Sequence, residues 1–205
     1  MVIANIACIL SKVFRSLTWK IQGEGRRVYL TFDDGPTPEV TEWVLNELYK
    51  FNAKATFFCL GKNAEAHPDL FKRIIQDGHA VGNHTYSHLK GFRNSVKDYC
   101  KDVDRAAELI NSKLFRPPYG RILPKQLKQI RKKYKIIMWS VLSLDYNSRI
   151  SEMQVVNNVT RHVKPGTIIV FHDSVKASKN LYIALPKVLE YLKENNFNPA
   201  ILPQS

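Results

Sequence analysis

The sequence predicts a single α/β domain in which helices cover a mostly parallel sheet. Short apolar runs alternate along the chain with segments whose apolar residues recur at helical spacing, about seven strands to six helices. Acids and histidines also follow several of the apolar runs, and the carboxyl ends of parallel strands carry the functional groups of a barrel. A doubly wound open sheet is disfavoured because no glycine-rich phosphate loop follows the first predicted strand.

Length and composition fit one globular domain and narrow the choice of partners. The chain has 205 residues, 44% hydrophobic and 24% charged, which is enough for one sizeable core. Its 31 lysines and arginines against 18 acids give a net charge of +13, which attracts nucleic acid, anionic glycans or a membrane surface. The charge is scattered, and no nucleic-acid motif accompanies the one compact run, residues 131–133. We expect a monomer with no nucleic-acid partner.

The first 27 residues form an apolar and basic segment ahead of the main predicted domain, residues 28–205. The apolar start is too short to cross a bilayer, and it lacks the basic start and the clear cleavage site of a signal peptide. We therefore expect the protein in the cytoplasm or at the cytoplasmic face of the membrane. Residues 1–20 are expected either to form a helix packed over one end of the barrel or to lie on a membrane surface.

The first predicted βαβ unit spans residues 28–60. Residues 28–32 are an apolar run that ends in two acids and a Gly-Pro turn. Residues 38–51 carry Val44, Leu45, Leu48 and Phe51 at helical spacing, and the apolar run 56–60 follows as the second strand.

The remaining elements repeat this alternation. Helical spacing predicts helices at 64–76, 95–111, 123–133, 152–162 and 181–195. Apolar runs bounded by turn residues predict strands at 79–82, 114–116, 136–142 and 167–171, with a last extended segment at 199–202.

Two adjacent acids, Asp33 and Asp34, end the first predicted strand. Successive residues of a strand face opposite ways, so the two carboxylates cannot have the same role. One of them can bind a metal ion while the other stands beside it as a base. Taken alone, Asp-Asp-Gly-Pro would fit a polar turn equally well.

Two histidines, His84 and His88, are four residues apart and would share one face of a helical turn. Together with the Asp34 carboxylate they make a set of two histidines and one acid, which leaves coordination positions open for water and substrate. This set predicts a catalytic metal site. Without the acid, the pair would more often be two ordinary loop histidines.

Two further motifs supply other chemical groups. In Arg116-Pro117-Pro118-Tyr119-Gly120 the prolines fix a loop, Arg116 needs an anion such as Asp33, and the Tyr119 N–H can point at a developing oxyanion. His172 ends the strongly apolar strand, and a carboxylate at Asp145 would raise the pKa of His172 and keep it protonated as an acid.

These four motifs, in this order, resemble the polysaccharide deacetylases of carbohydrate esterase family four, also called the nodulation-deacetylase homology domain. The resemblance covers roughly residues 28–202. It implies a distorted (β/α)7 TIM-like barrel. It also implies metal-dependent hydrolysis of a linear amide, the removal of N-acetyl groups from N-acetylglucosamine polymers or oligomers such as chitin or peptidoglycan.

The resemblance also implies a role for each residue. Asp33 resembles the base, and Asp34, His84 and His88 resemble the metal ligands, most often for zinc, with cobalt, nickel or manganese as alternatives. Arg116 is similar to the arginine that orients the base, Tyr119 to the residue that lends its backbone amide, and His172 with Asp145 to the acid and its partner. Implied substrate contacts are Pro118, Tyr119, Tyr146, Ile169 and Phe171, of which Ile169 and Phe171 stand where the family has leucines around the acetyl methyl.

The chain departs from the family pattern at Leu142 and Tyr146, where an aspartate and a tryptophan are common. The metal set depends on neither, so the departures affect the expected groove shape and substrate preference. Two other activities stay open at this point. One is an O-acetyl esterase acting on acetylated glycans such as xylan, and the other is a non-catalytic glycan-binding protein.

Overall fold

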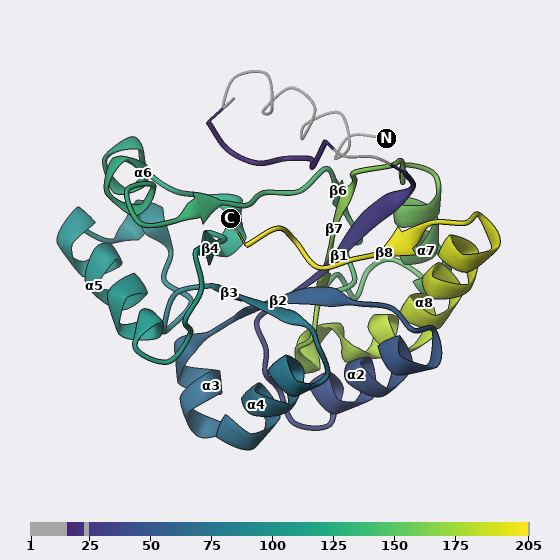
Figure 1. Ribbon diagram of the computed structural model, residues 1–205. Coiled ribbons are helices and arrows are strands. Elements are labelled where there is room, and N and C mark those ends of the chain that lie inside the picture. Colours follow the sequence, from purple (N-terminus) through teal and green to yellow (C-terminus); the bar gives the residue numbers. More distant parts are fainter. Residues whose placement is uncertain (1–15, 23–24, 205) are drawn as a thin grey trace.

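The computed structural model describes residues 16–22 and 25–204, which form a curled parallel sheet with helices on its outer side (Figure 1). The strands are β1 (Arg27–Asp33), β2 (Ala55–Cys59), β3 (Ala80–Asn83), β4 (Leu114–Phe115), β5 (Lys135–Ile136), β6 (Val141–Leu142), β7 (Ile168–His172) and β8 (Asn198–Pro199). They lie in the order β5-β4-β3-β2-β1-β7-β6, and β8 pairs with the start of β1. All these strand pairings are parallel, so the predicted distorted (β/α)7 barrel is confirmed.

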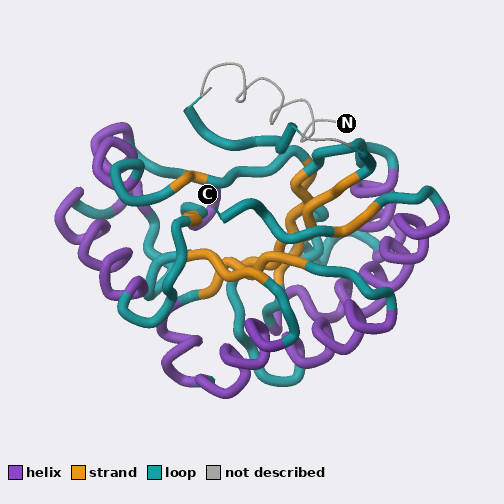
Figure 2. Tube along the Cα trace, in the orientation of Figure 1, coloured by secondary structure: helices purple, strands orange, loops and turns teal. Residues whose placement is uncertain are grey.

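Helices connect the strands and cover the outside of the sheet, as Figure 2 shows in purple around the orange strands. They are α2 (Val40–Lys50), α3 (Gly61–Ala66), α4 (Pro68–Gln76), α5 (Val96–Ala107), α6 (Pro124–Ile130), α7 (Glu152–Thr160) and α8 (Val175–Glu194), with short 3-10 turns η1 (Gly91–Arg93) and η2 (Pro118–Gly120). In the part of the chain that the structure describes, no helix has the length and apolar character needed to cross a membrane.

The central strand β1 is buried on both faces. Leu30 and Phe32 belong to the main hydrophobic cluster with residues of α2 and α8, because they point toward the helices. Thr31 and Asp33 point to the opposite side, the interior of the barrel, where both contact the fully buried Arg116. One face of β1 thus packs against the helices, and the other carries the polar side chains inside the barrel.

A segment ahead of β1 links the edge strand β5 with the start of β7. Thr18 pairs with Ile137, next to β5, while Lys20 pairs with Thr167, next to β7. Figure 1 shows this purple segment crossing from the β4 side to the β7 side. Trp19 between them is buried in the cluster around Tyr134. Residues 16–20 are therefore not helical; residues 1–15, the rest of the predicted amphipathic segment, lie outside the described residues.

Three element predictions are wrong in detail. The predicted helix 64–76 is two helices, α3 and α4, because Pro68 has no N–H for the previous turn and instead occupies the first position of α4. The predicted strand 136–142 is split into β5 and β6, since Met138 between them donates to Thr18 instead of a neighbouring strand. Helix α8 begins at Val175, six residues before the expected start at 181, and continues past Pro186.

Candidate active site

Asp33 and Arg116 form a buried ion pair inside the barrel. The Arg116 Nη1 donates to Asp33 Oδ1 at 2.6 Å and to Thr31 Oγ1 at 2.8 Å, while Nη2 donates to the Met138 carbonyl at 3.0 Å. Burial lowers the pKa of Arg116, and Asp33 opposes that shift by its charge and hydrogen bond. Thr31 and Asp33 belong to β1, and Met138 is held between β5 and β6 by its bond to Thr18, so Arg116 holds the Asp33 carboxylate in one orientation.

Asp34, His84 and His88 converge on one point beside this pair. The Asp34 Oδ1 lies 3.7 Å from His84 Nε2 and 3.3 Å from His88 Nε2. One ligand atom from each of the three residues lies within 4.8 Å of the other two, close enough to hold one metal ion. The Asp34 Oδ1 is buried, yet no hydrogen bond from the described residues reaches it, as expected of a carboxylate that binds a cation.

The imidazoles of His84 and His88 are neutral at pH 7, the form in which they can bind a metal ion. The His84 Nδ1 lies 2.8 Å from the Arg116 carbonyl, so it carries the proton and leaves Nε2 free. Burial lowers the pKa of His84 to about 3, against the charge of Asp34, which raises it. Burial likewise lowers the pKa of His88. Neutral imidazoles at pH 7 are the form that binds metal ions.

The segment that carries the two histidines is a loop, so the predicted helical turn is wrong. Thr85 and His88 have positive φ values of 68° and 60°, which a helix does not allow. Asp102 of α5 holds the loop by accepting the backbone N–H groups of Tyr86 and Ser87. The two imidazoles still meet, with ring centroids 5.2 Å apart.

The turn after β1 holds Asp34 in the left-handed region, with φ of 85°. The Asn63 side chain donates to the Asp34 carbonyl at 2.7 Å, and the Leu60 N–H donates to the Gly35 carbonyl at 2.9 Å. The Gly35 N–H donates to Asp173 Oδ1 at 3.0 Å, and a Cβ on Gly35 would overlap that carboxylate. Three hydrogen bonds thus hold the turn that carries Asp34, the candidate metal-binding acid.

Asp173 is a buried site residue that sequence reasoning missed. Its Oδ2 accepts a hydrogen bond from Thr41 Oγ1 at 2.6 Å. Burial raises the pKa of Asp173 to about 8, although the hydrogen bond from Thr41 lowers it. Its position directly after His172, at the end of an apolar strand, was the only signal available, and it does not reveal the contact with Gly35.

His172 and Asp145 form a second charged pair. The His172 Nδ1 lies 2.8 Å from Asp145 Oδ1, and the His172 backbone N–H donates to Asp145 Oδ2 at 2.7 Å. Burial lowers the pKa of His172, but the charge and hydrogen bond of Asp145, with smaller effects of Asp33 and Asp34, outweigh it and raise the pKa to about 9. His172 is therefore protonated at pH 7.

The Arg-Pro-Pro-Tyr-Gly loop places Tyr119 against His88, one of the three candidate metal ligands. Tyr119 has a φ of 60°, and its ring lies 4.6 Å from the His88 ring. Gly120 follows with a φ of 63°, and a Cβ there would collide with the Trp139 indole. Tyr119 is 52% exposed, so it lies at the surface of the site.

One cavity of about 690 Å³ joins all these groups. Its walls include the expected Asp33, Asp34, His84, His88, Tyr119, Tyr146 and His172. Asp145 and Arg116 lie directly behind this layer, bonded to His172 and Asp33. A cavity of this size, with a few polar groups at its base, is typical of small-molecule and substrate sites.

Three of the implied substrate contacts do not line the cavity. Ile169 and Phe171 are fully buried in the main hydrophobic cluster, on the helix side of β7, because strand residues alternate and His172 faces the cavity. Val170 lines the cavity in their place, so the prediction was one residue out of register. Pro118 is buried in η2 and does not line the cavity.

Sequence reasoning also missed residues on the outer part of the cavity. They are Lys90, Phe92, Arg121, Trp139, Ser174 and Lys176, and Leu142 joins them although it was noted only as a departure from the family pattern. Most lie in loops, and a loop gives no periodicity that would show which way a side chain faces. Val170, in contrast, could have been found by counting back two residues from His172.

Several known proteins are similar to this chain in sequence and in fold. The model of the polysaccharide deacetylase family matches residues 20–138. A peptidoglycan-N-acetylglucosamine deacetylase of Bacillus cereus is 38% identical over 184 residues, and the peptidoglycan-N-acetylmuramic acid deacetylase PdaC of Bacillus subtilis is 31% identical over 183 residues. Both alignments cover 86% of this chain, but they cover 66% of the first relative and 38% of the second. The crystal structure of the Bc1960 peptidoglycan N-acetylglucosamine deacetylase is 35% identical, with a TM-score of 0.87 over 94% of both chains.

Proposed function

The chain belongs to the polysaccharide deacetylase family, and on this premise we propose that it is a metal-dependent hydrolase that removes N-acetyl groups from a glycan containing N-acetylglucosamine. One observation carries the proposal. A single cavity brings together a fixed carboxylate, a triad of metal-binding residues and a protonated histidine. Hydrolysis of an amide needs a base, a means of stabilising the oxyanion and an acid for the leaving nitrogen.

Asp34, His84 and His88 would hold the metal ion, for which we propose zinc. Two neutral imidazoles and one carboxylate are a common donor set of catalytic zinc, and they leave positions open for water and substrate. When bound, such an ion makes water more acidic and polarises the acetyl carbonyl. The unpartnered Asp34 Oδ1 supports this assignment.

Asp33 would act as the general base. Arg116 already engages Oδ1, which fixes the plane of the carboxylate and directs its remaining lone pairs toward the cavity. The proton of the attacking water passes to this carboxylate. The backbone N–H of Tyr119, on the rigid loop beside His88, would donate to the oxygen on which negative charge develops.

His172 would act as the general acid. An amide nitrogen leaves poorly as an anion, so it must receive a proton as the C–N bond breaks. With its pKa raised to about 9, His172 carries that proton at neutral pH, and Asp145 balances the charge and fixes the ring. Tyr146 packs edge-on against the same ring, with centroids 4.8 Å apart, and further limits its rotation.

We propose peptidoglycan-like strands as the glycan, with N-acetylglucosamine as the reacting sugar. The relatives named for peptidoglycan deacetylation support this choice, and the open cavity leaves room for a polymer to enter. PdaC is named for the muramic acid residue, so a peptidoglycan strand offers two candidate acetylated sugars, whereas an N-acetylglucosamine oligomer offers one.

The test is acetate release from an N-acetylglucosamine oligomer, from peptidoglycan strands and from acetylated xylan. Each substrate is assayed with the protein as purified, after chelation and after zinc is added back. We expect release from the first two substrates that is lost on chelation and restored by zinc. Release from xylan alone would favour the O-acetyl esterase, and no release from any substrate by zinc-loaded protein would overturn the proposal.

A further inference from the structure

Three cations surround the cavity outside the groups that the proposed reaction uses. Lys90 follows the histidine loop, Arg121 follows η2, and Lys176 lies in the first turn of α8. All three side chains line the cavity, and Arg121 and Lys176 are exposed. Lys90 lies over Tyr119, which packs against His88, whereas Lys176 lies over Tyr146, which packs against His172. These two cations therefore flank the site from two sides, and Arg121 lies over Phe92 of the same cavity.

No acid of the described residues forms an ion pair with these cations. Within residues 16–22 and 25–204, no ion pair involves Lys90, Arg121 or Lys176. Each one rests on an aromatic ring instead. The Lys90 Nζ lies 5.3 Å from the Tyr119 ring centroid, the Lys176 Nζ 5.4 Å from that of Tyr146, and the Arg121 Cζ 5.7 Å from that of Phe92. The rings hold the cationic groups at the rim and leave their N–H donors free for a ligand.

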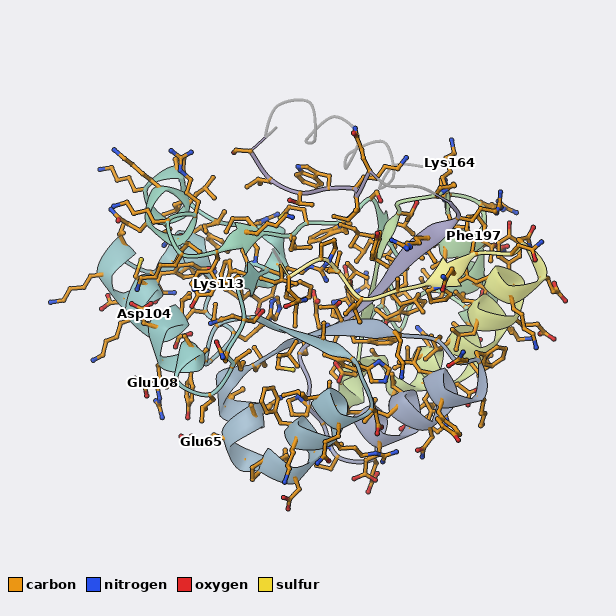
Figure 3. All side chains as sticks on the ribbon, in the orientation of Figure 1. Glu65, Asp104, Glu108, Lys113, Lys164 and Phe197 are labelled. Atoms are coloured by element: carbon orange, nitrogen blue, oxygen red, sulfur yellow. The ribbon has the colours of Figure 1, made fainter. Side chains whose placement is uncertain are left out.

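The catalytic acids do not account for the three cations. Among the described residues that line the cavity, Asp33 and Asp34 are the only acids. Asp33 is already paired with Arg116 at 2.6 Å, and Asp34 faces the metal-binding histidines. Other acids, such as Asp104 of α5 and Glu108 directly after it, are exposed and project from the outside of the molecule (Figure 3). The cations at the cavity therefore exceed the acids available to pair with them.

We propose that Lys90, Arg121 and Lys176 form an anion-binding rim that selects a glycan bearing carboxylate groups on both sides of the acetylated sugar. Lysine and arginine bind carboxylates through charge-assisted hydrogen bonds, and arginine can do so with two parallel bonds. A positive cavity also attracts an acidic polymer in a salt-dependent way. The inference rests on the proposed deacetylase function and specifies its substrate class: acidic strands are preferred over neutral, chitin-like ones.

The experiment compares two substrates that differ only in charge. They are peptidoglycan strands whose peptide carboxylates are free, and the same strands after those carboxylates have been amidated. For the zinc-loaded protein we expect a higher kcat/KM on the acidic strands, and we expect the preference to shrink as salt is added. In the triple variant Lys90→Gln, Arg121→Gln, Lys176→Gln, the preference should fall about tenfold, since each exposed ion pair contributes up to about fivefold.

A matched control removes three other cations. Lys72→Gln, Lys128→Gln and Lys187→Gln alter exposed lysines that lie outside the cavity, and they lower the net charge equally. The control should keep the full preference. An equal loss in both triple variants, or an unchanged preference in the rim variant, would overturn the inference.

A binding measurement separates this inference from the proposed function. If no variant releases acetate from any strand, the deacetylase proposal fails, and titration calorimetry with the same two substrates then tests the rim alone. Tighter binding of the acidic strand that only the rim variant loses would support the rim. Equal binding of the two strands by the unaltered protein would overturn it.

Discussion

His172 keeps its proton because a buried carboxylate, Asp145, bonds to its ring. In Asp145→Asn the charge disappears while the burial that lowers the His172 pKa remains. The pKa should then fall from about 9 toward or below the ordinary 6.5, since only the smaller effects of Asp33 and Asp34 still raise it. Since the protonated form is the acid, the alkaline fall of kcat/KM should move down by about two pH units or more. A pH–rate profile of both proteins checks this, and an alkaline fall that stays in place would mean that another group is the acid.

At the scale of single residues, most of the site could be predicted because its groups occur at strand ends. Asp33, Asp34 and His172 follow apolar runs, and parallel strands bring such ends together. Side-chain direction was harder to predict. Ile169 and Val170 are both apolar, so composition alone does not say which of them faces the cavity; only the alternation from His172 does.

The turn between β1 and α2 positions the metal-facing acid, and Gly35 is its most sensitive point. A methyl group in Gly35→Ala would lie 2.5 Å from the Asp173 Cγ and would push the turn away. We expect zinc affinity to fall on the order of tenfold or more, by analogy with the loss of outer-shell contacts at metal sites. Titration with zinc measures this.

Gly25→Ala serves as the control for that change: its φ of 75° strains the backbone of an alanine, but nothing lies within 4 Å of a Cβ there, so the change leaves the turn after β1 untouched. The Gly25 variant should bind zinc like the unaltered protein. A Gly35 variant with unchanged zinc affinity would show that the Asp173 contact does not position Asp34.

At the scale of elements, helices and strands with clear periodicity were predicted, and the connections between them were not. The spacing of His84 and His88, four residues apart, predicts a helical turn. In the structure Thr85 and His88 have positive φ, and the N–H groups between them donate to the Asp102 carboxylate, a partner that the local spacing does not reveal. Likewise the apolar run 136–142 reads as one strand. Its middle residues bond to Thr18, a partner more than a hundred residues away that local pattern cannot reveal.

For the molecule as a whole, the segment that links β5 and β7 contributes to stability through Trp19. Trp19 is only 8% exposed and packs in the cluster with Tyr134 and Met138. Trp19→Ala should lower the free energy of unfolding by about 3 kcal/mol. Denaturant unfolding measures this. Lys20→Ala, at an exposed neighbour, should change it by less than about 0.5 kcal/mol. Equal effects of the two changes would mean that the segment does not stabilise the barrel.

The central claim is that one metal ion, held by Asp34, His84 and His88, makes this cavity a deacetylase site. The most direct measurement follows acetate release while zinc is titrated into chelated protein. We predict that activity rises to a plateau at one zinc per chain, and that Asp34→Ala shows neither the rise nor tight zinc binding. His162→Ala, at a histidine outside the cavity, should behave like the unaltered protein. Acetate release that survives chelation, or that persists in Asp34→Ala, would contradict the account.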